Sequence, residues 1–207
     1  LNTVLAVVAA ILVGAAWAGI AGVLRASRGV SEVISTIMLN AISTYLVAYL
    51  LRKAAVQEQG SNIIATKEIP EGSRIPGFAL SDQAGATVYG FVFIAILLGI
   101  GYWVMLNRTR FGFDLRATGR SEPAAIASGI DTKRMIIYTM LISGGLAGLV
   151  GLPILFGAAY SYGSTFQSGL GFAGIAIALL GRNHPIGIAL GALLFAFLDE
   201  QSSPLQI

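Results

Sequence analysis

Residues Asn107–Arg134 read NRTRFGFDLRATGRSEPAAIASGIDTKR, and they lie between the two longest uncharged runs of the chain. This basic segment carries six of the thirteen lysine and arginine residues. Within it, Ser121 is placed to cap a short helix whose first turn holds Glu122 and Pro123, where proline is tolerated because that N–H has no intrahelical partner. Gly129 can then end the helix in the left-handed conformation. The pattern therefore predicts a capped helix of about two turns.

Such a short helix is not stable alone in water, because nucleation costs more than its few hydrogen bonds return. It needs a surface to pack against, and its alanine and glycine side chains suit the groove of another protein. The alternative is an ordinary loop helix that lies on lipid headgroups. Asp131 is placed to cap the apolar run from Met135, which would join the short helix to the next span.

The composition is that of a membrane protein. The chain is 56% hydrophobic and 11% charged, with a mean hydropathy of +0.79, whereas soluble domains have about 25% charged residues. We expect an all-α, polytopic fold with one membrane domain over residues 1–207. The net charge of +3 gives no reason to expect a nucleic-acid partner, and the lack of cysteine excludes disulfides and thiolate metal sites. One histidine and no acidic cluster in an apolar run argue against any metal site.

Four apolar runs are long enough to cross a bilayer, which takes about 20 residues: Leu1–Leu24, Val33–Leu51, Gln83–Asn107 and Met135–Phe156. Glycines in the first run (Gly14, Gly19 and Gly22) and Gly144-x-x-x-Gly148 in the fourth predict close helix packing. Tyr89 is one of the aromatic residues expected to anchor the third span at an interface.

The last part of the chain predicts broken helices. Its two apolar pieces, Gly171–Leu180 and Ile186–Leu198, are each shorter than a span and meet at Gly181–Pro185. Short or glycine-broken segments occur at membrane depth where their polar backbone is buried or lines a cavity.

The distribution of basic residues predicts the orientation. Residues 52–86 hold four basic residues balanced by four acidic ones, whereas residues 107–134 hold six, and Arg25 and Arg28 lie on the same side as that segment. The positive-inside rule then places residues 25–32 and 107–134 in the cytoplasm and residues 52–86 outside.

Four stretches resemble a known family: GVSEVISTIMLN at Gly29–Asn40, LRATGRSEPAAIASGI at Leu115–Ile130, ISGGLAGLVG at Ile142–Gly151, and GLGFAGIAIALLGRNHPIG at Gly169–Gly187. Together they look like the permease subunits of ATP-binding-cassette importers of the branched-chain amino acid, ribose and nucleoside type, and most like the nucleoside and simple-sugar branch. Chains of that family are longer, and this one opens without methionine, so we expect it to be a fragment with spans missing at both ends.

The resemblance implies that residues 107–134, the coupling segment, carry a helix docked into a separate ATPase subunit. Motif positions carried over to this sequence are Arg116, Gly119, Ser121, Glu122, Pro123, Ala124, Ala125 and Gly129. No Gly-x-x-x-x-Gly-Lys-Ser/Thr occurs in the chain, so ATP and Mg²⁺ would be bound by the partner and this chain would not be an enzyme. Other implied partners are a second permease, identical or homologous, an extracellular substrate-binding protein, and the lipid of a bacterial plasma membrane that this chain crosses several times.

Several polar and aromatic residues are candidates for the solute path or its gate, and each has a plainer interpretation. Asn40 lies near the middle of a span and could contact solute or bond another helix. Phe172 could stack on a base or sugar, as could Tyr160, Tyr162 and Phe166, which an interface belt also explains. The group Arg182, Asn183 and His184 could form a gate or a simple turn. Glu32 could take part in gating or form a salt bridge to Arg25 or Arg28.

We therefore predict an ATP-driven importer that moves nucleosides, with ribose-like sugars or branched-chain amino acids as alternatives. A secondary transporter or channel is a second class, although such proteins usually keep an ionisable residue deep in a span. An intramembrane hydrolase using Ser143 and His184 is a third, but the chain has no G-x-S-x-G motif.

Overall fold

The computed structural model describes residues 2–54, 65–70, 72, 77–79, 87–163, 166 and 169–202. Within them, four helices are long and apolar enough to cross a membrane: Thr3–Arg28, Glu32–Ala54, Phe91–Arg108 and Thr132–Ala159, the last of which contains a break. They correspond to α1 (Asn2–Arg28), α2 (Glu32–Ala54), α3 (Phe91–Arg108) and the stretch that opens with α6 (Thr132–Gly148). The predicted all-α, polytopic membrane fold is confirmed.

The third span is shorter than predicted. Helix α3 begins at Phe91, not at Gln83, and Tyr89 lies in the strand β2 (Thr87–Tyr89), which pairs antiparallel with β1 (Gly77–Ala79). Tyr89 is therefore not on the helix that it was expected to anchor, and residues 83–86 lie outside the described part of the chain. The predicted loop 52–86 also needs correction, because α2 continues to Ala54. Hydropathy alone did not separate a short β-hairpin from the apolar helix that follows it.

Helices α1 and α6 pack with their backbones in contact, as the glycine pattern predicted. A Cβ atom added at Gly14 would overlap the carbonyl oxygen of Gly144, and one added at Gly148 would overlap the carbonyl oxygen of Ala10. Gly19 and Gly22 face Leu141 and Met140 of α6 in the same way. Without side chains between them the two helices gain close van der Waals contact, which drives helix association in lipid. The pair therefore forms the tightest unit of the bundle.

The C-terminal half is broken at Gly181–Pro185, as predicted, where one helix ends at Leu180 and the next begins at Pro185. The fourth span is also broken, before its predicted end. The fourth span was expected to run from Met135 to Phe156, whereas α6 begins at Thr132 and ends at Gly148. A turn leads into α7 (Leu152–Ile154) and the π-helical segment η2 (Leu155–Ala159). Pro153 lies in the first turn of α7, where its missing N–H is tolerated, and it cannot continue a helix from upstream.

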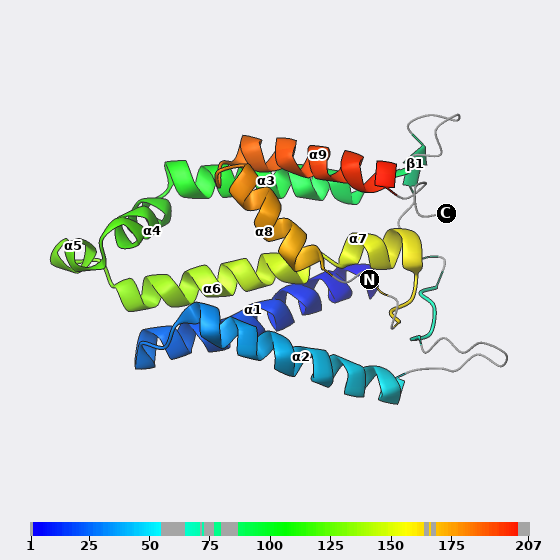
Figure 1. Ribbon diagram of the computed structural model, residues 1–207, viewed down its shortest axis with the longest axis horizontal. Coiled ribbons are helices and arrows are strands. Elements are labelled where there is room, and N and C mark those ends of the chain that lie inside the picture. Colours follow the sequence, from blue (N-terminus) through cyan, green and yellow to red (C-terminus); the bar gives the residue numbers. More distant parts are fainter. Residues whose placement is uncertain are drawn as a thin grey trace.

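After this break the chain forms a helical hairpin of α8 (Leu170–Leu180) and α9 (Pro185–Ser202). Figure 1 shows α9 lying alongside α3, with α8 folded back from it as the second helix of the hairpin. The close turn between α8 and α9 brings the backbones of Gly181 and Gly187 together.

The two ends of the bundle are distinct (Figure 1). One end holds the turn between α1 and α2, the end of α3, and the helices α4 (Arg110–Arg120) and α5 (Glu122–Ala127). The other end holds the end of α2, the β-hairpin, and α7 with η2. Residues 25–32 and 107–134 therefore share one end, which agrees with the alternation of spans inferred from the basic residues.

Candidate functional site

The short helix predicted in the coupling segment is present as α5, and both of its ends are capped. The Ser121 hydroxyl oxygen accepts a hydrogen bond from the Ala124 N–H at 3.4 Å. At the other end Gly129 has a φ of 83°. Its N–H donates to the Ile126 carbonyl at 2.9 Å, and the next N–H, that of Ile130, donates to the Ala125 carbonyl at 3.0 Å. This is the Schellman arrangement, which satisfies carbonyls that would otherwise lack partners at the helix end.

Helix α5 is joined to the next span with little freedom between them. The Asp131 carboxylate accepts from the Arg134 N–H at 3.1 Å and caps α6, as predicted. The Thr132 hydroxyl donates across the turn to the Glu122 carboxylate at 3.5 Å, and Thr132 is only 4% exposed. Two successive helix caps and one side-chain bridge therefore connect α5 to the beginning of α6.

The sequence interpretation missed the helix α4, which fills most of the region taken for a loop. The Thr109 hydroxyl oxygen caps it by accepting from the Gly112 N–H at 3.1 Å. Gly112 is buried, and a Cβ there would overlap the carbonyls of Met105 and Leu106, so α4 folds back tightly on α3. The signal was present in the threonine cap and in the spacing of Phe111 and Leu115, but the many arginines obscured it.

A groove of about 470 Å³ lies between α4 and α5. Its lining is mostly small or apolar, and its charged members come from α4; the lining residues are Phe113, Arg116, Ala117, Arg120, Ser121, Ala124, Ala125 and Ser128. The Arg116 guanidinium donates to the Asn107 side-chain oxygen at 3.2 Å, which fixes its direction along α4. Phe113 is 63% exposed beside the groove. This combination suits a protein surface that offers a carboxylate beside apolar side chains.

Helix α5 projects from the bundle. Figure 1 shows it at the extreme end of the molecule, beyond α4 and next to the beginning of α6. Ala125 is 2% exposed and faces inward, whereas Ile126 is 58% exposed at the tip. Docking on a protein and lying on lipid headgroups both stay predictions for α5.

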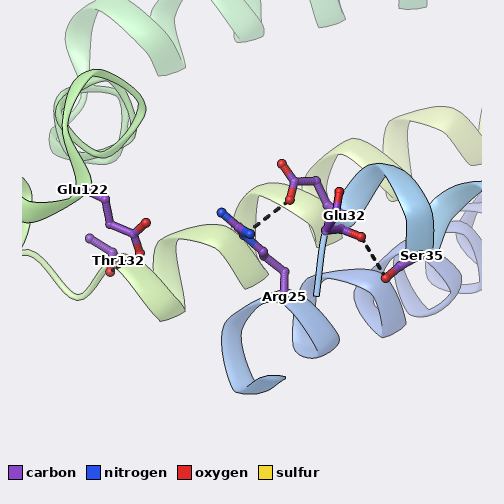
Figure 2. A network of polar contacts seen from close by, with 6 residues as sticks. Arg25, Glu32, Ser35, Glu122 and Thr132 are labelled. Carbon is purple, nitrogen blue, oxygen red and sulfur yellow. Dashed lines mark hydrogen bonds and ion pairs between the residues drawn. The ribbon is translucent and has the colours of Figure 1, made fainter. Parts of the chain in front are cut away.

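A second polar pair lies at the same end of the bundle. The Arg25 guanidinium and the Glu32 carboxylate form an ion pair at 3.3 Å across the turn between α1 and α2, which confirms the salt-bridge interpretation of Glu32. The Ser35 hydroxyl donates to the Ser31 carbonyl at 3.1 Å and closes the first turn of α2. Figure 2 shows the ion pair of Arg25 and Glu32, with Glu122 and Thr132 to one side.

The candidate path residues are spread over three elements. Asn40 is exposed on α2, and its carbonyl accepts from the hydroxyls of Ser43 at 2.8 Å and Thr44 at 3.0 Å. Phe172 is 76% exposed on α8. Arg182, Asn183 and His184 form the exposed turn between α8 and α9, with Arg182 and Asn183 in left-handed conformations. Among the described residues no hydrogen bond or ion pair joins Asn40 to the others, so the structure does not assemble them into one site.

The chain matches the family described as the branched-chain amino acid transport system permease component over residues 1–206. It belongs to this permease family. The nucleoside ABC transporter permease protein NupB of Lactococcus lactis subsp. cremoris is 35% identical over 201 residues, which are 94% of this chain and 55% of that protein. The guanosine permease NupP of Bacillus subtilis is 33% identical, over 94% of this chain and 55% of its own length.

A sugar permease is also among the relatives. The glucose ABC transporter permease protein TsgB13 of Haloferax volcanii is 30% identical over 96% of this chain and 54% of that protein. This permease chain therefore spans about half the length of the curated relatives that it matches. No solved structure matches it.

The family and the four apolar helices support the predicted localisation of this permease, as a multi-pass protein of the bacterial inner membrane. The hydrolase alternative gains no support from the geometry. Ser143 lies on α6 and His184 lies in the α8–α9 turn, and no hydrogen bond joins them within the described part of the chain.

Proposed function

We propose that this permease is the membrane-spanning subunit of an ATP-driven importer of nucleosides, and that the coupling segment docks into a separate ATPase subunit. The observation that carries the proposal is the construction of α5. It projects from the bundle, is capped at both ends, and continues through the Asp131 cap into α6, which lies backbone to backbone against α1. A force applied to α5 would thus move two spans together.

The mechanism follows from this rigid connection. ATP and Mg²⁺ would be bound by the partner, and closure of its nucleotide-binding sites would push on the α4–α5 groove. Arg116 and Arg120 would hold the partner's carboxylates there, while Ala124 and Ala125 give a shallow surface that allows close approach. Gly119 lies on α4 outside the groove lining, so no contact with the partner is proposed for it. Hydrolysis itself would belong wholly to the partner, so this chain is not proposed to be an enzyme.

The solute would pass along the polar face of α2. Thr36, Asn40 and Thr44 recur at a spacing of four and so share one face of that helix, and all three are exposed in this chain. The Asn40 side chain forms no hydrogen bond within the described residues, although an unpaired amide is costly in a bilayer. Uncharged amide and hydroxyl groups suit the polar edges of a nucleoside and offer no charge pair for an amino-acid zwitterion.

Phe172 and the Arg182–His184 turn are proposed as the second side of the path or its inner gate. The exposed Phe172 ring could stack on a nucleobase. The turn offers hydrogen-bond donors for a solute. The charge of Arg182 would be tolerated at membrane depth only where water or an opposite charge is close by. A second copy of the permease, or a homologous one, would complete the path, and a substrate-binding protein outside the cell would deliver the solute.

Sugar import is the second candidate, because relatives named for glucose and ribose also align over 96% of the chain. The test is uptake by proteoliposomes that contain the full-length permease, its ATPase and its binding protein, with tritiated guanosine, uridine, ribose and glucose as probes. Guanosine or uridine uptake that requires ATP on the side of the membrane where the ATPase is bound supports the proposal. Uptake of sugars alone would favour the second candidate, and uptake driven by a proton gradient without ATP would contradict both.

A further inference from the structure

A short segment at the end of the bundle opposite the coupling segment is held by residues almost a hundred positions away. Residues 65–70, which we call the strap, lie along residues 160–163. The Thr66 N–H donates to the Tyr162 carbonyl and the Ile69 N–H donates to the Tyr160 carbonyl, each at 2.8 Å. The Tyr162 N–H donates in return to the Thr66 hydroxyl oxygen at 3.0 Å. Ala65 lies opposite Gly163 as an antiparallel bridge partner.

The strap binds where the membrane helix is interrupted. Segment η2 ends at Ala159, and the next residue, Tyr160, has a left-handed φ of 52°. Backbone groups at such a break have lost their helical partners, and an unpaired one is costly where water is scarce. The strap supplies donors and an acceptor to this turn. The strap is thus attached at a turn that follows the end of a helical segment.

The strap is also anchored by a single side chain. Ile69 packs against a buried cluster of Phe91, Leu152 and Phe156, which brings α3, α7 and η2 together. Partly buried residues of α1 complete this cluster; they are Ala6, Val7 and Ala10. The strap therefore closes over the point where four elements converge (Figure 1).

These attachments differ in kind from those that hold the bundle together. Helices α1 and α6 are locked by backbone contact along several turns, whereas residues 65–70 are each exposed or only half-buried. Segments with few buried contacts open at much lower free energy than the core. Short π-helical segments such as η2 also occur frequently at functional sites.

We infer that the strap is the outer gate of the solute path: bound to residues 160–163 it closes the outer end of the bundle, and it must detach for solute to enter. The inference rests on the proposed function, because the outer side is the side opposite the coupling segment. It assigns a transport role to Thr66, Ile69 and Tyr162.

A disulfide across the bridge tests the gate. Residues 1–207 contain no cysteine, so an Ala65→Cys, Gly163→Cys double variant introduces the only two thiols of this part of the permease, and cysteines elsewhere in the transporter are replaced by serine. Directly opposed residues in an antiparallel pair have Cα atoms about 4.5–5.5 Å apart, which is within the range for a disulfide. The double variant is reconstituted in the complete transporter and oxidised. Its remaining free thiols are then counted with a maleimide polymer, because each labelled thiol slows the permease band on a denaturing gel by one step. Tritiated guanosine uptake is then measured before and after reduction.

We expect the disulfide to form in the resting transporter, uptake to fall in proportion to the cross-linked fraction, and reduction to restore it. The matched Ala65→Ser, Gly163→Ser variant should keep its uptake under oxidation, and the ATPase should still copurify with the cross-linked permease. Normal uptake by a fully cross-linked transporter would overturn the gate, as would failure of the disulfide to form. Equal loss of uptake in the serine variant would also overturn it, because the strap would then be needed only for folding. Loss of the ATPase from the unmodified transporter would instead contradict the proposed function.

Discussion

Gly129 offers the sharpest test of the rigid connection between α5 and α6, because its role depends on backbone conformation alone. Its φ is 83°, and nothing lies within 4 Å of a Cβ added there. A Gly129→Ala variant therefore meets no steric obstacle from its surroundings and suffers only the cost of a left-handed alanine, which is about 1–2 kcal/mol. That cost lowers the ratio of capped to uncapped α5 by about 5- to 30-fold. Coupling to the ATPase should fall by the same factor where it requires the capped α5.

Gly119 provides the matched control. A Cβ there also meets nothing within 4 Å, but Gly119 lies within the helix α4 and its φ is not in the left-handed region. Gly119→Ala should be neutral or stabilising by roughly 0.5–1 kcal/mol, since alanine loses less entropy than glycine in a helix. The assay is ATP-dependent uptake, with stimulation of the ATPase by the reconstituted permease measured in parallel. Gly129→Ala should be strongly impaired in both readouts and Gly119→Ala should not. Equal behaviour of the two variants would refute the argument that the left-handed cap transmits force.

Two further predictions concern packing and charge. Gly144→Leu forces side-chain atoms against the backbone of α1 and should lower the thermal unfolding midpoint in detergent. Gly101→Leu should lower it far less, since a Cβ at Gly101 meets nothing within 4 Å. Similar midpoints for the two variants would contradict the backbone contact between α1 and α6. Glu32→Gln removes the ion pair between Glu32 and Arg25, whose side chains are 48% and 37% exposed. The free energy of unfolding should therefore fall by only about 0–1 kcal/mol, and the thermal midpoint should stay close to that of the unmodified protein. A much larger fall in the midpoint would show that this pair has a role beyond the surface.

Local features of the fold were readable in the sequence. The caps at Ser121 and Asp131, the left-handed Gly129, and the glycine faces of α1 and α6 each follow from a residue type at a fixed position or spacing. These were predicted because capping and close packing depend on neighbours within a few residues. The same reasoning gave the salt bridge at Glu32, whose partner is seven residues away.

Features that depend on distant partners were not readable. The pairing of Thr66 with Tyr162 joins residues 96 positions apart, and no local pattern marks either one. The break after Gly148 was displaced in the prediction, because the apolar run continues through it and hydropathy does not register a change of direction. Helix α4 was missed for the opposite reason, since its arginines read as a solvated loop although a threonine cap and an apolar repeat were present.

The assignment of Asn40, Phe172 and the Arg182–His184 turn to one solute path stays a prediction. Asn40 is on α2, at one edge of the bundle, whereas Phe172 and the turn belong to the α8–α9 hairpin. The chain spans about half the length of the relatives NupB and NupP.

The most direct test of the central claim uses the absence of native cysteine. Ile126→Cys places a single thiol on the exposed tip of α5, and Lys67→Cys places one on the exposed strap at the opposite end. Each is labelled with a photoreactive maleimide in membranes that contain the complete transporter, and the cross-linked product is identified by mass spectrometry. The account predicts that the probe at Ile126 captures the ATPase subunit and the probe at Lys67 does not. Capture of the ATPase from Lys67, or of lipid alone from Ile126, would contradict it.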